Sequence, residues 1–90
     1  MSPKNKKKLD IIRKKLDQID NQLLAIIKKR TFLVNEVVKL KENKSEIVDQ
    51  KRISSILKNI KAKSIKNNID QKITNRIWKN MIWSYINYER

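Results

Sequence analysis

The sequence predicts an all-α protein of three helices, one very long, one short and one of medium length. The chain contains no glycine, and its single proline is Pro3, so little in it breaks helices or builds tight turns. Apolar residues recur at alternating steps of three and four through the first half of the chain, which places them on one side of a helix. Ninety residues make at most one domain, and a chain of this size has only a marginal core of its own.

The first helix is predicted over about residues 8–42, after a disordered basic N-terminus at residues 1–7. Two interleaved series, each spaced by seven, form one apolar seam: Leu9, Leu16, Leu23 and Val37, with Ile12, Ile19, Ile26, Leu33 and Leu40. Such a helix is roughly 50 Å long, more than the remaining residues can cover. The seam therefore needs a second copy of the chain or a large partner, and its 3.5-residue period favours another long helix.

Arg30 occupies a position of this seam where a leucine is expected. A guanidinium among apolar side chains is costly unless an anionic group meets it. No acidic residue lies three or four positions away on the same helix. The partner is therefore expected from another helix or from a ligand.

Residues 43–48 interrupt the pattern and predict a loop. Asp49 is a predicted N-cap for a second helix over about residues 50–65. One face of that helix is apolar and comprises Ile53, Ile56, Leu57 and Ile60. Asn67 and Asn68 can supply a left-handed residue at its end. Asp70 is expected to cap a third helix that runs to about residue 89, with apolar Ile73, Ile77, Met81, Ile82, Tyr85 and Ile86.

Composition excludes several functions. With no Cys or His, the chain lacks the usual ligands of zinc and the pairs of nucleophilic catalysis. No stretch of about 18 apolar residues predicts a membrane span, and no signal peptide is evident, so we expect a cytoplasmic protein without a membrane partner. The net charge of +14 suggests nucleic-acid binding. Because 18 of the 23 basic residues are Lys beside many Ile and Asn, biased coding DNA explains part of it, and a basic nucleic-acid-binding module remains only an alternative.

The five arginines stand out in a chain so rich in lysine, because arginine grips carboxylates and phosphates through two parallel hydrogen bonds. Arg13 and Lys41 flank the seam that contains Arg30. Arg13 and Arg30 lie roughly 25 Å apart along one helix, too far to hold one small molecule from the same chain. In a dimer with antiparallel long helices, Arg13 of one chain can approach Arg30 and Lys41 of the other. Near the C-terminus, Tyr85 and Glu89 share a helical face.

The stretch LDIIRKKLDQIDNQLLAIIKKRTFLVNEVVKLK resembles the first helix of the AroQ-class chorismate mutases. The residues that match with every spacing kept are Arg13, Asp17, Asp20, Leu23, Leu24, Arg30 and Lys41. The segment IVDQKR resembles the start of the family's second helix and supplies Asp49 and Arg52, and RIWKNMIWSYINYE resembles its third helix. The resemblance covers about residues 9–89, with one short gap at 42–46, and identifies residues 8–90 as a mutase-like domain.

The resemblance implies an intertwined homodimer with two equivalent sites, each built from both chains. It also implies a Claisen rearrangement of chorismate to prephenate in aromatic amino acid biosynthesis, without metal, cofactor or covalent intermediate. In the implied site, Arg13 of the partner chain and Arg30 grip the two carboxylates, and Lys41 and Glu89 face the ether oxygen. Asp49 helps to hold the C4 hydroxyl. Arg52 supports the edge of the site, and Tyr85 occupies a position that is usually a small hydroxyl residue.

Two departures leave the substrate open. Ile53 replaces a glutamate that usually contacts the C4 hydroxyl. Isochorismate-pyruvate lyases and 4-amino-4-deoxychorismate mutases share the fold and carry an aliphatic residue there, so both remain alternatives, as does a non-catalytic relative. Glu89 must be protonated to donate to the ether oxygen, so activity is expected to fall as pH rises through the acid range.

Overall fold

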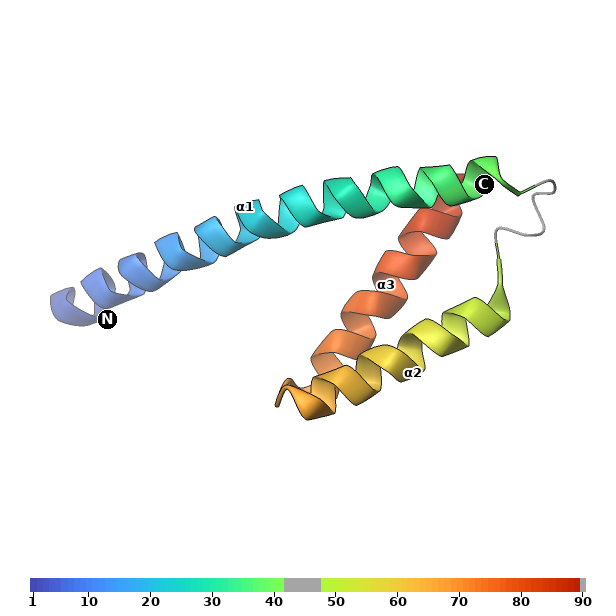
Figure 1. The fold of residues 1–90 in the computed structure, drawn as a ribbon. Coiled ribbons are helices and arrows are strands. Elements are labelled where there is room, and N and C mark those ends of the chain that lie inside the picture. Colours follow the sequence, from blue (N-terminus) through green and yellow to red (C-terminus); the bar gives the residue numbers. More distant parts are fainter. Residues whose placement is uncertain (42–47, 90) are drawn as a thin grey trace. The chain divides into compact units, whose positions relative to one another are not determined.

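The computed structural model describes residues 1–41 and 48–89, and these residues form three helices and no strand. The helices are α1 (Pro3–Lys39), α2 (Gln50–Lys66) and α3 (Gln71–Glu89) (Figure 1). The predicted all-α class, with one very long, one short and one medium helix, is confirmed. The chain divides into two compact units, Met1–Val37 and Val38–Arg90, and each is described by itself.

Helix α1 begins at Pro3, earlier than the predicted start near residue 8. The hydroxyl of Ser2 accepts the backbone N–H of Asn5 at 3.2 Å, and the backbone N–H of Lys6 donates to the carbonyl of Ser2 at 2.8 Å. Pro3 suits the first helical position, where no N–H is needed. With this local cap, the helix starts ahead of the run of lysines. The helix also ends at Lys39 rather than at residue 42. The predicted division of the chain into residues 1–7 and a domain of residues 8–90 stays a prediction.

The apolar seam of α1 is exposed along its length. From Ile12 to Val37, its apolar side chains have between 49% and 62% of their surface exposed. No residue of α1 is buried. A contiguous apolar surface of this length is characteristic of an interaction site rather than of solvent-facing helix. The first unit therefore has no core of its own within the described chain.

Helix α2 starts as predicted, at an aspartate cap. The carboxylate Oδ1 of Asp49 accepts a hydrogen bond from the backbone N–H of Arg52 at 3.0 Å. This satisfies one of the backbone N–H groups at a helix start that have no acceptor within the helix. The predicted apolar face is also confirmed, because its four members are half-buried while most of α2 is exposed: Ile53, Ile56, Leu57 and Ile60.

The turn between α2 and α3 uses a left-handed asparagine in place of glycine, as predicted. Asn68 has φ 56°. Its backbone N–H donates to the carbonyl of Ile65 at 3.2 Å, and the N–H of Ile69 donates to that of Ser64 at 2.8 Å. This pair of bonds is the Schellman arrangement. Asp70 then caps α3, since its Oδ1 accepts the N–H of Lys72 at 2.9 Å.

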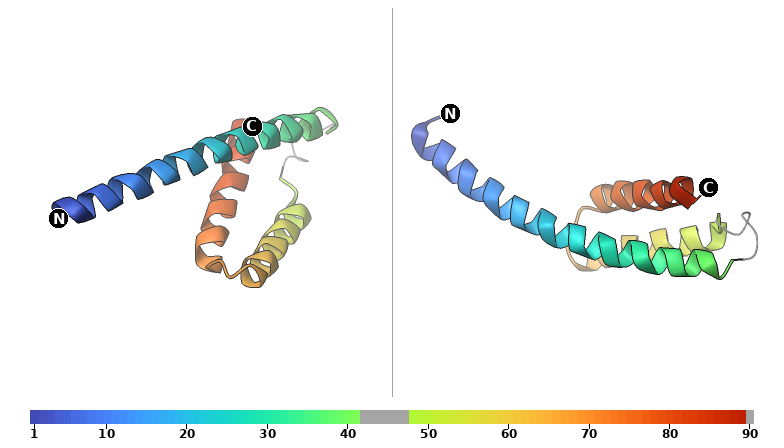
Figure 2. Two further views of the ribbon diagram at one scale, coloured as in Figure 1. Left: turned by 60° about the vertical axis from the view of Figure 1, so that its left-hand side comes forward. Right: turned by 90° about the horizontal axis from the view of Figure 1, so that it is seen from above.

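Helices α2 and α3 pack against each other as a hairpin (Figure 2). Near the turn, the buried hydroxyls of Ser64 and Thr74 meet at 2.7 Å. Further along α3, Ile82 and Ile86 are buried, with 7% and 5% of their surface exposed. Among the described residues, no helix combines the length and hydropathy that crossing a membrane requires.

Candidate functional site

Two of the predicted site residues, Lys41 and Asp49, line the same open depression. Both belong to the second unit. The remaining lining residues are Val48, Gln50 and Lys51. The depression therefore joins the segment after α1 to the first turn of α2, and it combines cationic side chains with one carboxylate.

Asp49 has a structural task besides any contact with a ligand. Its Oδ1 is committed to the N–H of Arg52 in the α2 cap. That bond orients the carboxylate, which lines the depression, through one of its two oxygens. The group of Arg52 that meets Asp49 here is its backbone N–H, and the side chain of Arg52 is exposed.

Arg13 and Arg30 lie on α1 in the first unit. Because α1 is continuous from Pro3 to Lys39, the rise of an α-helix separates them by roughly 25 Å. Arg13 is exposed, whereas Arg30 is half-buried within the seam. One chain therefore keeps these two arginines apart. The sequence predicted this separation.

Tyr85 and Glu89 lie on the last turns of α3. Tyr85 is half-buried and is followed by buried Ile86. Glu89 ends the helix one turn later, a spacing that puts the two residues on one face. The side chain of Glu89 lies outside the described part of the structure, so its predicted role is untested.

Ile53, the main departure from the family pattern, is half-buried on the inward face of α2. It lies one turn below the cap formed by Asp49. An aliphatic side chain here adds apolar surface where a glutamate would supply a hydrogen-bond acceptor. The position can therefore change which substituent the neighbouring site prefers.

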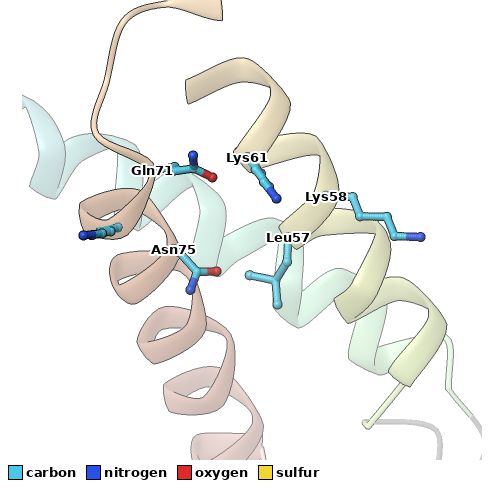
Figure 3. Close-up of a pocket in the computed structure, with 6 residues that line it drawn as sticks. Leu57, Lys58, Lys61, Gln71 and Asn75 are labelled. Carbon is cyan, nitrogen blue, oxygen red and sulfur yellow. The ribbon is translucent and has the colours of Figure 1, made fainter. Parts of the chain in front are cut away.

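A second hollow lies between α2 and α3 and contains none of the predicted site residues (Figure 3). Its lining residues are Leu57, Lys58, Lys61, Gln71, Lys72 and Asn75. Figure 3 shows Leu57 of α2 and Asn75 of α3 pointing toward each other, whereas Lys58 points away from the space between the helices. Within the described residues, no three His, Cys, Asp or Glu side chains gather as a metal site would require.

Lys51 is the residue of the depression that the sequence did not single out. In the sequence it lies between Asp49 and Arg52, but it is one of 18 lysines. Only the fold places it beside Lys41.

The family model described as chorismate mutase type II matches residues 12–90, which include every residue of the predicted site. No curated protein and no solved structure matches the chain.

Proposed function

The chain belongs to the chorismate mutase type II family, a family of isomerases, and from this premise we propose that two copies of it build the sites that rearrange chorismate to prephenate. The observation that carries the proposal is the family match over residues 12–90. The depression shared by Lys41 and Asp49 supports it, because it puts two residues of the expected site side by side.

The chemistry requires shape and charge rather than a nucleophile. In one molecule a carbon–oxygen bond breaks while a carbon–carbon bond forms, and negative charge grows on the ether oxygen. The protein has to hold an extended dianion in a compact conformation and stabilise that charge. Arg13 of the partner subunit and Arg30 bind the two carboxylates. Lys41 and Glu89 donate to the ether oxygen from opposite sides.

Asp49 orients the substrate through its hydroxyl group. One carboxylate oxygen is fixed by the α2 cap at 3.0 Å. The carboxylate therefore does not need to be ordered when substrate arrives, which lowers the entropic cost of binding. Its second oxygen accepts from the C4 hydroxyl, while Arg52 supports the edge of the site and Tyr85 closes it from α3.

The exposed seam of α1 supports the homodimer. Its apolar side chains are about half-exposed or more from Ile12 to Val37, and its heptad spacing suits a second long helix. With two such helices antiparallel, Arg13 of one protomer reaches the site that holds Arg30 of the other. The roughly 25 Å between the two arginines of one chain then places them in the two different sites of the dimer.

Mixing two inactive variants tests this shared site. Arg13→Ala and Arg30→Ala homodimers should each lack turnover. After unfolding and refolding together, a mixed dimer has one site with both arginines and one with neither. With random pairing, activity should recover to about one quarter of that of wild type. Unrecovered activity in a mixture shown to contain mixed dimers would contradict a site built from two chains.

Ile53 supports a second candidate on the same fold. An aliphatic side chain at this half-buried position is shared with isochorismate-pyruvate lyases and 4-amino-4-deoxychorismate mutases. The retained Asp49 favours a mutase, because the lyase has no C4 hydroxyl of the same kind to hold.

Nucleic-acid binding remains the alternative of another class and predicts salt-sensitive binding spread over many lysines. A cytoplasmic location stays a prediction.

A further inference from the structure

We propose that Lys51 is a capture residue, whose ammonium group draws the dianionic substrate toward the depression lined by Lys41 and Asp49. The proposal rests on the proposed function, since it concerns the same substrate and site. Lys51 lies on the wall of that depression and is exposed. An exposed, hydrated charge adds little to the chemical step but increases the local concentration of an oppositely charged ligand.

The local charge balance favours this role. Among the described residues that line the depression, Lys41 and Lys51 carry two positive charges and Asp49 carries one negative charge. Asp49 already accepts a backbone N–H of the α2 cap. The described lining of the depression is therefore net positive, which favours an anionic ligand.

The position of Lys51 is unfavourable for the helix itself. It lies in the first turn of α2, which contains no acidic residue. The start of a helix carries partial positive charge, so cations there destabilise it. Lys63 and Lys66, by contrast, lie in the last turn of α2, where cations are favourable. Helix stability therefore does not favour a lysine at position 51, whereas attraction of an anion is consistent with one.

The test compares Lys51→Gln with Lys79→Gln in the full chain. Lys79 is exposed on α3 and lines neither the depression nor the hollow between α2 and α3, so the control removes the same charge elsewhere. Steady-state turnover of chorismate is measured over a series of salt concentrations. Lys51→Gln should lower kcat/KM about fivefold at low salt, as expected for a dianion roughly 8 Å from one charge in water, and leave kcat unchanged.

Three further readouts separate capture from a structural effect. The decline of kcat/KM with salt should be shallower for Lys51→Gln than for wild type, and Lys51→Arg should restore both. The melting temperature of Lys51→Gln should be equal to or above that of wild type. Equal kcat/KM and equal salt dependence in the two Gln variants would overturn the proposal while the mutase function stands. A wild-type protein that converts no chorismate would overturn the proposed function and the capture role with it.

Discussion

The hydroxyl oxygens of Ser64 and Thr74 lie 2.7 Å apart and join α2 to α3 beside their turn. Both residues are buried, with 3% and 9% of their surface exposed. The hydroxyl of Ser64 also donates to the carbonyl of Ile60 at 2.6 Å. Each hydroxyl has only one proton, and the alternative bond of Thr74, to the carbonyl of Gln71, is long at 3.4 Å, so Thr74 is the better placed donor between the two. The pair fixes how α2 and α3 pack, and so the orientation of the helix that starts at Asp49 and of the one that carries Tyr85.

Removing either hydroxyl should destabilise the protein. Ser64→Ala leaves the Thr74 hydroxyl only its longer bond to the carbonyl of Gln71, at 3.4 Å, and Thr74→Val leaves a buried Ser64 lone pair unmet. Each should cost about 1–2 kcal/mol of unfolding free energy. The double variant should cost less than the sum, measured by urea unfolding at one fixed chain concentration. Strict additivity would show that the two hydroxyls do not interact.

Asn68 should tolerate only residues that accept a left-handed backbone. Its φ of 56° predicts that Asn68→Gly keeps or slightly raises stability. Asn68→Ala should cost about 1 kcal/mol, because the crowding of Cβ in that conformation is no longer offset by the local hydrogen bonding that a short polar side chain allows. Thermal unfolding of the two variants side by side checks this. Equal melting temperatures would mean that residue 68 is not left-handed in solution.

Asp49 has two tasks that substitution can separate. Asp49→Ser retains a capping oxygen but removes the carboxylate, so stability should be nearly unchanged while kcat/KM falls roughly tenfold or more. Asp49→Ala should lose activity and also about 1 kcal/mol of stability. Urea unfolding and steady-state kinetics measure the two effects. Wild-type kcat/KM in Asp49→Ser would remove this carboxylate from the site.

Glu89 should make turnover depend on pH. Only a protonated carboxyl donates to the ether oxygen, so kcat/KM should fall as pH rises through the acid range and the donor is lost. The amide of Glu89→Gln donates at every pH, so that variant should give a flat profile and higher activity at alkaline pH. A flat profile for wild type from mildly acidic to alkaline pH would count against Glu89 as the donor.

The sequence predicts features that depend on local spacing. The start of α2 at Asp49, the left-handed Asn68 and the apolar face of α2 follow from caps and periodicity, and the structure confirms them. The early start of α1 was missed because a run of lysines looks like a solvated tail, although Ser2 and Pro3 are a sound helix start. The Ser64–Thr74 contact was missed because serine and threonine within helices carry no signal of the partner they meet.

The residues of the candidate site also differ in whether the sequence alone reveals them. Arg30 is recognisable from sequence because a charge interrupts an apolar series. Lys51 is not, because its neighbours in space come from a segment ten residues earlier, around Lys41. The approach of Arg13 to Arg30 depends on a second chain, and no spacing within one chain can supply it.

Identification of the product gives the most direct test of the function. The purified protein is incubated separately with chorismate, isochorismate and 4-amino-4-deoxychorismate, and the products are identified by mass. We predict rapid formation of prephenate from chorismate. Arg30→Ala should lower that rate roughly 100-fold or more, with the same dimer mass by light scattering. Absence of product from all three substrates would contradict an enzymatic role for this chain.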